Sequence, residues 1–192
     1  GGVIERGTIV VTGNRITDLG PTNRVAVPTD ALRVAATGKT IIPGIVDVHA
    51  HVGGASSGIL AETNWSFVAN LAYGVTTMRD PQTGTHNAFA YQDLVDAGIS
   101  IGPRAYSTGR GVFNNTDFKS FEETRDLLAR YKKYYRTDTV KAYVSGNRKQ
   151  RQWIVKASKE LEIMPTTEGS LDLKLNLTHA IDGFSGNEHS FP

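Results

Sequence analysis

The sequence predicts an α/β protein, an incomplete parallel barrel of the (β/α)8 TIM-like type with about six strands, preceded by a small β-subdomain. In residues 41–192, short apolar strand-like runs alternate with amphipathic helical stretches. This alternation is typical of parallel strands that are joined by helical crossovers. A complete (β/α)8 barrel takes about 250 residues, so residues 41–192 are enough for about six of its eight strands.

Residues 1–40 differ from the rest, because they contain short strand-like runs and turn residues but no helical pattern. The runs read "GTIVV", "ITDLG", "RVAV" and "LRVAA", and "TGNR" separates the first two. Gly13 and Asn14 tolerate the backbone angles of a tight hairpin turn. We therefore expect residues 1–40 to form a β-subdomain with too few strands to close a core, and residues 41–192 to form the barrel.

Within the second part, each strand-like run is followed by a helical stretch. The predicted helices lie near residues 60–72, 87–97, 121–135, 148–161 and 171–182. Gly74 and Gly98 are placed to end the first two helices in a left-handed conformation. Ser120 and Glu123 have the spacing of a capping box at the start of the third.

Composition narrows the classes of partner. The formal net charge is +2, from 21 basic and 19 acidic residues spread along the chain, so nucleic acid is not expected as a partner. No apolar run reaches the roughly 20 residues of a membrane span, so no membrane partner is expected either. The chain has no cysteine, which excludes disulfides and thiolate metal sites and leaves the compartment undecided.

The strongest chemical signal is the end of "IIPGIVDVHAHVG", where His49 and His51 follow an apolar run. Side chains of a strand alternate between its faces, so these two imidazoles point the same way. In a barrel of this type, functional groups lie at the carboxyl ends of the strands, where Lys141 and His189 also occur. Neutral imidazole is a good ligand for zinc and similar ions, and a bound ion would activate a water molecule.

Several segments resemble the amidohydrolase superfamily, most closely its imidazolonepropionase- and prolidase-like branch of metal-dependent hydrolases. The segments are "GKTIIPGIVDVHAHVG", "AYGVTTMRD", "TVKAYVSG" and "GNEHS", and residues 1–40 resemble the first part of that family's N-terminal β-sandwich. The resemblance implies that His49, His51 and His189 are metal ligands. It also implies that Lys141 is the strand-four lysine, which many members carboxylate to bridge two metal ions. The cofactor would be one or two divalent ions, with zinc the expected metal.

Two departures from the family pattern concern the site. The fifth strand reads "MPTTEG" where the family has a ligand histidine, although Glu168 could supply an oxygen ligand there. The family's strand-eight aspartate has no counterpart before Pro192, so the chain looks truncated. We expect a metal-dependent hydrolase that cleaves an amide, ester or cyclic amide bond of a small molecule, with Lys141 and Glu168 as catalytic residues.

A second hypothesis is a catalytically incomplete barrel fragment that serves as a binding or assembly module. An open sheet has two unpaired edges, so such a chain would pair with another copy of itself or with a complementing fragment. Simpler interpretations also exist for single residues. His49 and His51 could be a hydrogen-bonded structural pair, and Arg79 with Asp80 could be part of an ion pair below the rim. We expect His179 to face outwards from its helix and His86 to contact substrate or water.

Overall fold

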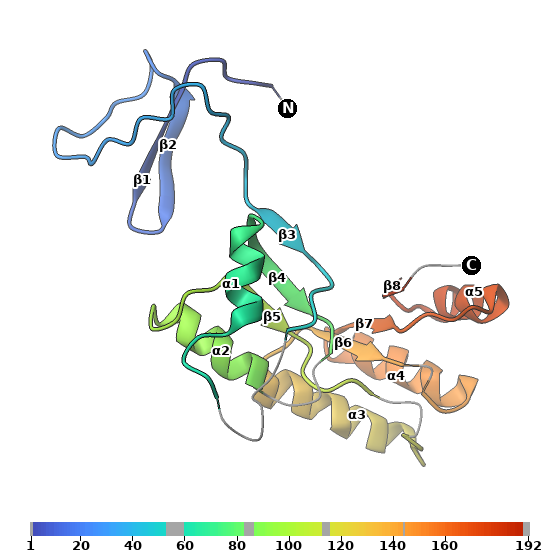
Figure 1. Ribbon diagram of the computed structural model, residues 1–192. Coiled ribbons are helices and arrows are strands. Elements are labelled where there is room, and N and C mark those ends of the chain that lie inside the picture. Colours follow the sequence, from blue (N-terminus) through green and yellow to red (C-terminus); the bar gives the residue numbers. More distant parts are fainter. Residues whose placement is uncertain (1, 53–59, 83–86, 113–115, 144, 190–192) are drawn as a thin grey trace. The chain divides into compact units, whose positions relative to one another are not determined.

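The computed structural model describes residues 2–52, 60–82, 87–112, 116–143 and 145–189 (Figure 1). The chain forms two units, one that ends at Ile42 and one that begins at Pro43. In the first unit, β1 (Gly7–Thr12) and β2 (Arg15–Pro21) form an antiparallel hairpin. The turn between them contains Gly13 in a left-handed conformation, with φ 61°.

The prediction of further strands in the first unit was wrong. The segments "RVAV" and "LRVAA" contain no strand. Pro28 lies between them and has no amide hydrogen to donate to a neighbouring strand, and Pro21 closes β2 just before them. Apolar residues in this stretch therefore resemble a strand in composition without forming one.

The second unit alternates strands and helices. In chain order its elements are β3 (Ile45–Asp47), α1 (Trp65–Ala72), β4 (Val75–Asp80), α2 (Asn87–Asp96), β5 (Arg104–Ser107), α3 (Phe121–Arg130), the π-helical turn η1 (Tyr131–Tyr135), β6 (Thr139–Ala142), α4 (Arg148–Glu160), β7 (Met164–Thr167), α5 (Leu173–Asp182) and β8 (Gly186–Asn187). The prediction of an α/β protein with parallel β–α units is confirmed.

The strands of the second unit form two parallel sheets whose order follows the chain, β3-β4-β5 and β6-β7-β8. Val112, which follows β5, links them through a parallel bridge to Ala142. Its amide donates to the carbonyl of Lys141 at 2.9 Å, and its carbonyl accepts from the amide of Tyr143 at 2.8 Å. In the part of the chain that the structure describes, no strand pairing closes these sheets into a complete barrel.

Side-chain hydrogen bonds cap the first turns of α3 and α4. Ser120 caps α3 by accepting from the amide of Glu123, but the Glu123 carboxylate accepts from the amide of Lys119. The reciprocal capping box predicted at Ser120 and Glu123 is therefore only half formed. A complete capping box occurs instead at the start of α4, between Asn147 and Gln150. Both segments carry a capping residue followed three residues later by Glu or Gln, so spacing alone does not tell which box closes.

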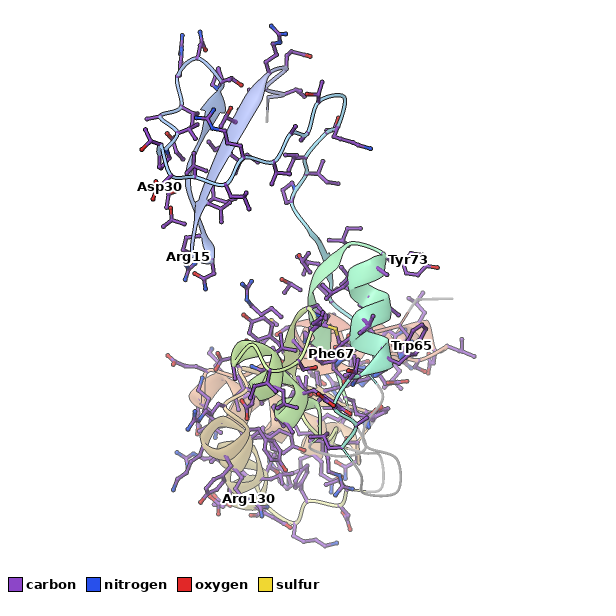
Figure 2. All side chains as sticks on the ribbon, turned by 60° about the vertical axis from the view of Figure 1, so that its left-hand side comes forward. Arg15, Asp30, Trp65, Phe67, Tyr73 and Arg130 are labelled. Atoms are coloured by element: carbon purple, nitrogen blue, oxygen red, sulfur yellow. The ribbon has the colours of Figure 1, made fainter. Side chains whose placement is uncertain are left out.

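Each sheet packs against its own helices. Phe67 of α1 is fully buried against Met78 of β4 and Tyr91 of α2, while Trp65 and Tyr73 are exposed on the other side of α1 (Figure 2). A second apolar cluster joins α3, η1, α4 and β6, and α3 and α4 lie side by side (Figure 1). Its fully buried members include Leu128, Val140 and Ile154. The two sheets are linked by the bridge between Val112 and Ala142, and each sheet has its own apolar cluster that holds its strands in place.

The helix α5 reverses the expected orientation. His179 is fully buried, next to the Thr167 hydroxyl and 5.3 Å between ring centroids from Phe184, so the prediction that it faces outwards was wrong. The opposite face carries Leu173, Leu177 and Ile181, which are 53%, 54% and 78% exposed. Spacing by four residues predicts that these three share a face, but it does not tell which face is covered. None of the helices in the described ranges is long and apolar enough to cross a membrane.

Candidate functional site

The candidate site lies at the carboxyl ends of the strands of the second unit. Backbone hydrogen bonds continue the strand pairing beyond the regular strands and hold the site residues there. The amide of Ala50 donates to the carbonyl of Arg79 at 2.9 Å, and the amide of His189 donates to the carbonyl of Glu168 at 3.2 Å. The histidines that flank Ala50 are thus fixed beside the end of β4, and His189 beside the end of β7.

His49 and His51 face each other through their Nε2 atoms, which are 3.2 Å apart. The other nitrogen of each ring contacts an oxygen. His49 Nδ1 is 3.0 Å from Oε2 of Glu188, and His51 Nδ1 is 3.3 Å from Oδ1 of Asp80 and 3.1 Å from the carbonyl oxygen of Gln82. A carboxylate–histidine pair is the arrangement that orients histidine ligands in many metal sites.

These contacts determine where the ring hydrogens lie. A carbonyl or an ionised carboxylate can only accept a hydrogen bond, so each Nδ1 donates and carries a hydrogen. In the neutral rings, both Nε2 lone pairs therefore point toward the same small region. Either a proton on one Nε2 or a cation between them removes the resulting repulsion.

A divalent ion fits this nitrogen pair. Zinc binds imidazole nitrogen at about 2.0–2.1 Å with tetrahedral angles, which places two ligand nitrogens about 3.3–3.4 Å apart. The separation of 3.2 Å between the two Nε2 atoms is close to that value. However, among the described residues no group of three or more histidine, aspartate or glutamate side chains is arranged to hold a metal ion.

Burial and neighbouring charges tune the groups around the pair. Burial is the main cause that lowers the pKa of His49 below its ordinary value, with Glu188 acting in the opposite direction. Burial also raises the pKa of Asp80, against hydrogen bonds from Gln82 and His51. Burial would raise the pKa of Glu188 too, but the hydroxyl of Thr166 and the guanidinium of Arg79 outweigh it and lower that pKa. Glu188 is thus an ionised carboxylate beside His49.

Lys141, Glu168 and His189 form a second group beside the histidine pair. The Lys141 side chain is 1% exposed, and its Nζ lies 2.6 Å from Oε2 of Glu168, which is 33% exposed. The other Glu168 oxygen is 3.3 Å from Nε2 of His189. The rings of His189 and His49 have centroids 4.9 Å apart, so the first and the last strand of the second unit bring imidazoles together.

All of the predicted site residues therefore lie near one another, while their roles as ligands or catalysts stay predictions. Lys141 points inwards as expected, and its ammonium pairs with a carboxylate. Arg79 forms an ion pair with Glu188, Nη1 to Oε1 at 3.0 Å, whereas Asp80 contacts His51. His86 falls outside the described residues.

Two site residues were not singled out as functional from the sequence. These residues are Glu188 and Tyr143. The hydroxyl of Tyr143 donates to the side chain of Gln82 at 2.8 Å, and its ring lies 4.8 Å from Lys141 Nζ. The available signal was position, because Tyr143 lies two residues beyond Lys141 and so on the same side of an extended chain.

Comparisons with known proteins support the fold. No family model and no curated protein sequence matches the chain. Among solved structures, it is similar to a provisionally assigned prolidase from Bifidobacterium longum, with a TM-score of 0.68 and 20% identity over 93% of this chain and 47% of the other. It is also similar to a Xaa-Pro dipeptidase with methionine bound in its active site, with a TM-score of 0.63 and 16% identity over 93% and 55%. A third match is phenylurea hydrolase B, with a TM-score of 0.61 and 17% identity over 92% and 53%.

All three matches are at or below 20% identity, so they support the α/β fold with parallel β–α units that the sequence predicts. The chain spans about half the length of the solved structures that it matches.

Proposed function

We propose that this chain contributes the histidine-bearing half of the active site of a metal-dependent hydrolase that cleaves an amide, ester or cyclic amide bond. The observation that carries the proposal is the pair of Nε2 atoms of His49 and His51, 3.2 Å apart, with both Nδ1 atoms occupied by oxygen acceptors. The fold likeness to a dipeptidase and a phenylurea hydrolase supports the same reaction class, because both names describe hydrolases. We further propose that the two sheets are six consecutive strands of an incomplete (β/α)8 barrel.

In this proposal His49 and His51 hold a divalent ion, with zinc as the expected metal, and His189 completes the ligand set. Whether one or two ions bind depends on Lys141, whose ammonium pairs with Glu168 in the structure. An ion bound there would polarise a substrate carbonyl and lower the pKa of a bound water molecule toward neutrality.

The residues of the chain have separate tasks around that ion. The Glu168 carboxylate, which is partly open to solvent beside His189, accepts the proton that the attacking water loses. The buried ammonium of Lys141 lies 2.6 Å from the Glu168 carboxylate and adds positive charge where negative charge develops in the transition state. The proposed substrate is a small molecule.

The test combines metal analysis with hydrolysis assays. We expect the purified chain to bind zinc or cobalt near one equivalent, and a double variant His49→Ala/His51→Ala to lose that binding. Xaa-Pro dipeptides, a phenylurea and an aryl ester are suitable first substrates, with a chelator as the comparison. Glu162→Gln, an exposed change in the turn after α4, is the control. A chain that binds neither ion, or hydrolysis that is insensitive to the chelator, would contradict the proposal.

A second candidate function is supported by the exposed apolar face of α5. Leu173, Leu177 and Ile181 lie on one side of that helix without cover from the described part of the chain. The outer edges of β3 and β8 pair with no other described strand. The chain would then act as an assembly module that is completed by a second copy or by a complementing fragment. Light scattering decides between the candidates, because a stable monomer with metal-dependent activity would exclude obligate pairing.

A further inference from the structure

The carboxylate of Glu188 connects the two sheets of the second unit at the level of the histidine pair. Its Oε2 lies 3.0 Å from His49 Nδ1, and its Oε1 accepts from Nη1 of Arg79 at 3.0 Å and from the hydroxyl of Thr166. The side chain is only 7% exposed. Both oxygens are therefore engaged by groups of the chain itself, and neither is directed at an open ligand position.

Arg79 is the group that holds this carboxylate in place. Besides Glu188, its guanidinium contacts the carbonyl of Val48 at 3.3 Å and the hydroxyls of Thr139 and Thr166, each at 3.5 Å. Arg79 lies on β4, and these partners lie at β3, β6 and β7. A planar guanidinium with several donors in fixed directions can fix a carboxylate in one orientation, which a single ammonium cannot do.

The orientation of Glu188 decides which nitrogen of His49 carries the hydrogen. An imidazole has two neutral tautomers, and the partner of one nitrogen selects the state of the other. Because the carboxylate accepts at Nδ1, Nε2 is left without a hydrogen and faces Nε2 of His51. Without Glu188, the two tautomers would differ little in free energy, and Nε2–H of His49 could donate directly to His51.

We propose that Glu188, held by Arg79, is a positioning residue that keeps His49 in the tautomer with the hydrogen on Nδ1. The inference rests on the proposed function in one respect, that the freed Nε2 serves to bind a divalent ion. By itself the assignment of the tautomer is independent of any metal. The ion pair of Arg79 on β4 with Glu188, just after β8, would then orient His49 in addition to linking the two sheets.

Nitrogen NMR of the metal-free, isotopically labelled full chain tests the tautomer directly. We expect Nδ1 of His49 to be protonated and Nε2 unprotonated in the wild-type protein, with the signals assigned by their loss in His49→Gln. Glu188→Gln should give a mixture of tautomers, because a carboxamide can donate as well as accept. Arg79→Lys, which keeps the charge and loses the planar fork, should shift the same signals in the same direction. Glu162→Gln should leave them unchanged.

Zinc binding, measured against a competing chelator, provides the second readout. Loss of a partner outside the ligand set typically weakens metal affinity about 10- to 100-fold, and we expect that range for Glu188→Gln. Circular dichroism of the variants identifies any that fail to fold, and the wild-type spectrum alone can overturn the inference by showing an unprotonated Nδ1. If the wild-type chain has the expected tautomer but binds no zinc, the proposed function fails and the positioning role stands. If zinc binds and Glu188→Gln changes neither the tautomer nor the affinity, the positioning role fails and the proposed function stands.

Discussion

Replacing Glu168 by leucine removes the partner of a buried ammonium group. The Nζ of Lys141 is 2.6 Å from the Glu168 carboxylate, and the lysine side chain is 1% exposed. Removing one member of a buried ion pair costs about 3–5 kcal/mol, because the remaining charge is left without compensation. Glu168 is 33% exposed, so water screens the pair in part and we expect the lower end, about 3 kcal/mol. For a chain of this size, that loss lowers the melting temperature by about 6 to 12 °C.

Thermal melts followed by circular dichroism measure this effect. The double variant Lys141→Met/Glu168→Leu should recover most of the lost stability, because replacing both buried charges by apolar groups is often neutral. Glu5→Leu, at an exposed position of the first unit, is the control. The reasoning would be refuted by a Glu168→Leu variant that melts at or above the wild-type temperature. That result would indicate that Lys141 is carboxylated, since a carbamate is an anion and would be repelled by Glu168.

Three further predictions concern stability. Burial lowers the pKa of His179 in the folded state below its ordinary value of 6.5. As the pH decreases below 6.5, the unfolded chain therefore binds this proton before the folded chain does, and the free energy of unfolding decreases. In urea unfolding at pH values above and below 6.5, His179→Asn should lose less stability at the lower pH than the wild-type chain does. An equal loss in both proteins would contradict the role of His179. Leu128→Ala should cost about 2–5 kcal/mol in the same assay because Leu128 is fully buried, whereas the exposed Leu32→Ala should cost far less. Gly102→Ala should cost about 1–3 kcal/mol, since a Cβ there would lie 2.5 Å from the ring of Phe67, and an unchanged unfolding midpoint would show that the ring can move aside.

Much of the fold could be predicted because its signals are local. The alternation of strand-like and helical runs is written in the order of the residues, and the five predicted helices all occur, with α3 continuing into η1. The errors came where a local pattern has two solutions. "RVAV" and "LRVAA" have strand composition but do not form strands. His179 was expected to face outwards from α5, but it is buried there together with Asn176.

The candidate site was predictable to the extent that it depends on one strand. His49 and His51 are two residues apart, so the period of an extended chain places them on the same side, and the structure has them 3.2 Å apart at Nε2. Their partners come from elsewhere in the chain, Asp80 from β4 and Glu188 from the end of β8. No spacing in the sequence relates residue 188 to residue 49.

By itself the sequence determined the kinds of elements, their order, and the presence of imidazoles and a lysine at strand ends, because these depend on periodicity over a few residues. Only the tertiary structure decided which carboxylate each imidazole contacts, that Lys141 pairs with Glu168, and that Arg79 reaches Glu188 instead of its neighbour Asp80. The physical reason is that these contacts join residues far apart in the chain. Their distances follow from how the strands align side by side and how the helices pack behind them, which depends on the whole second unit at once.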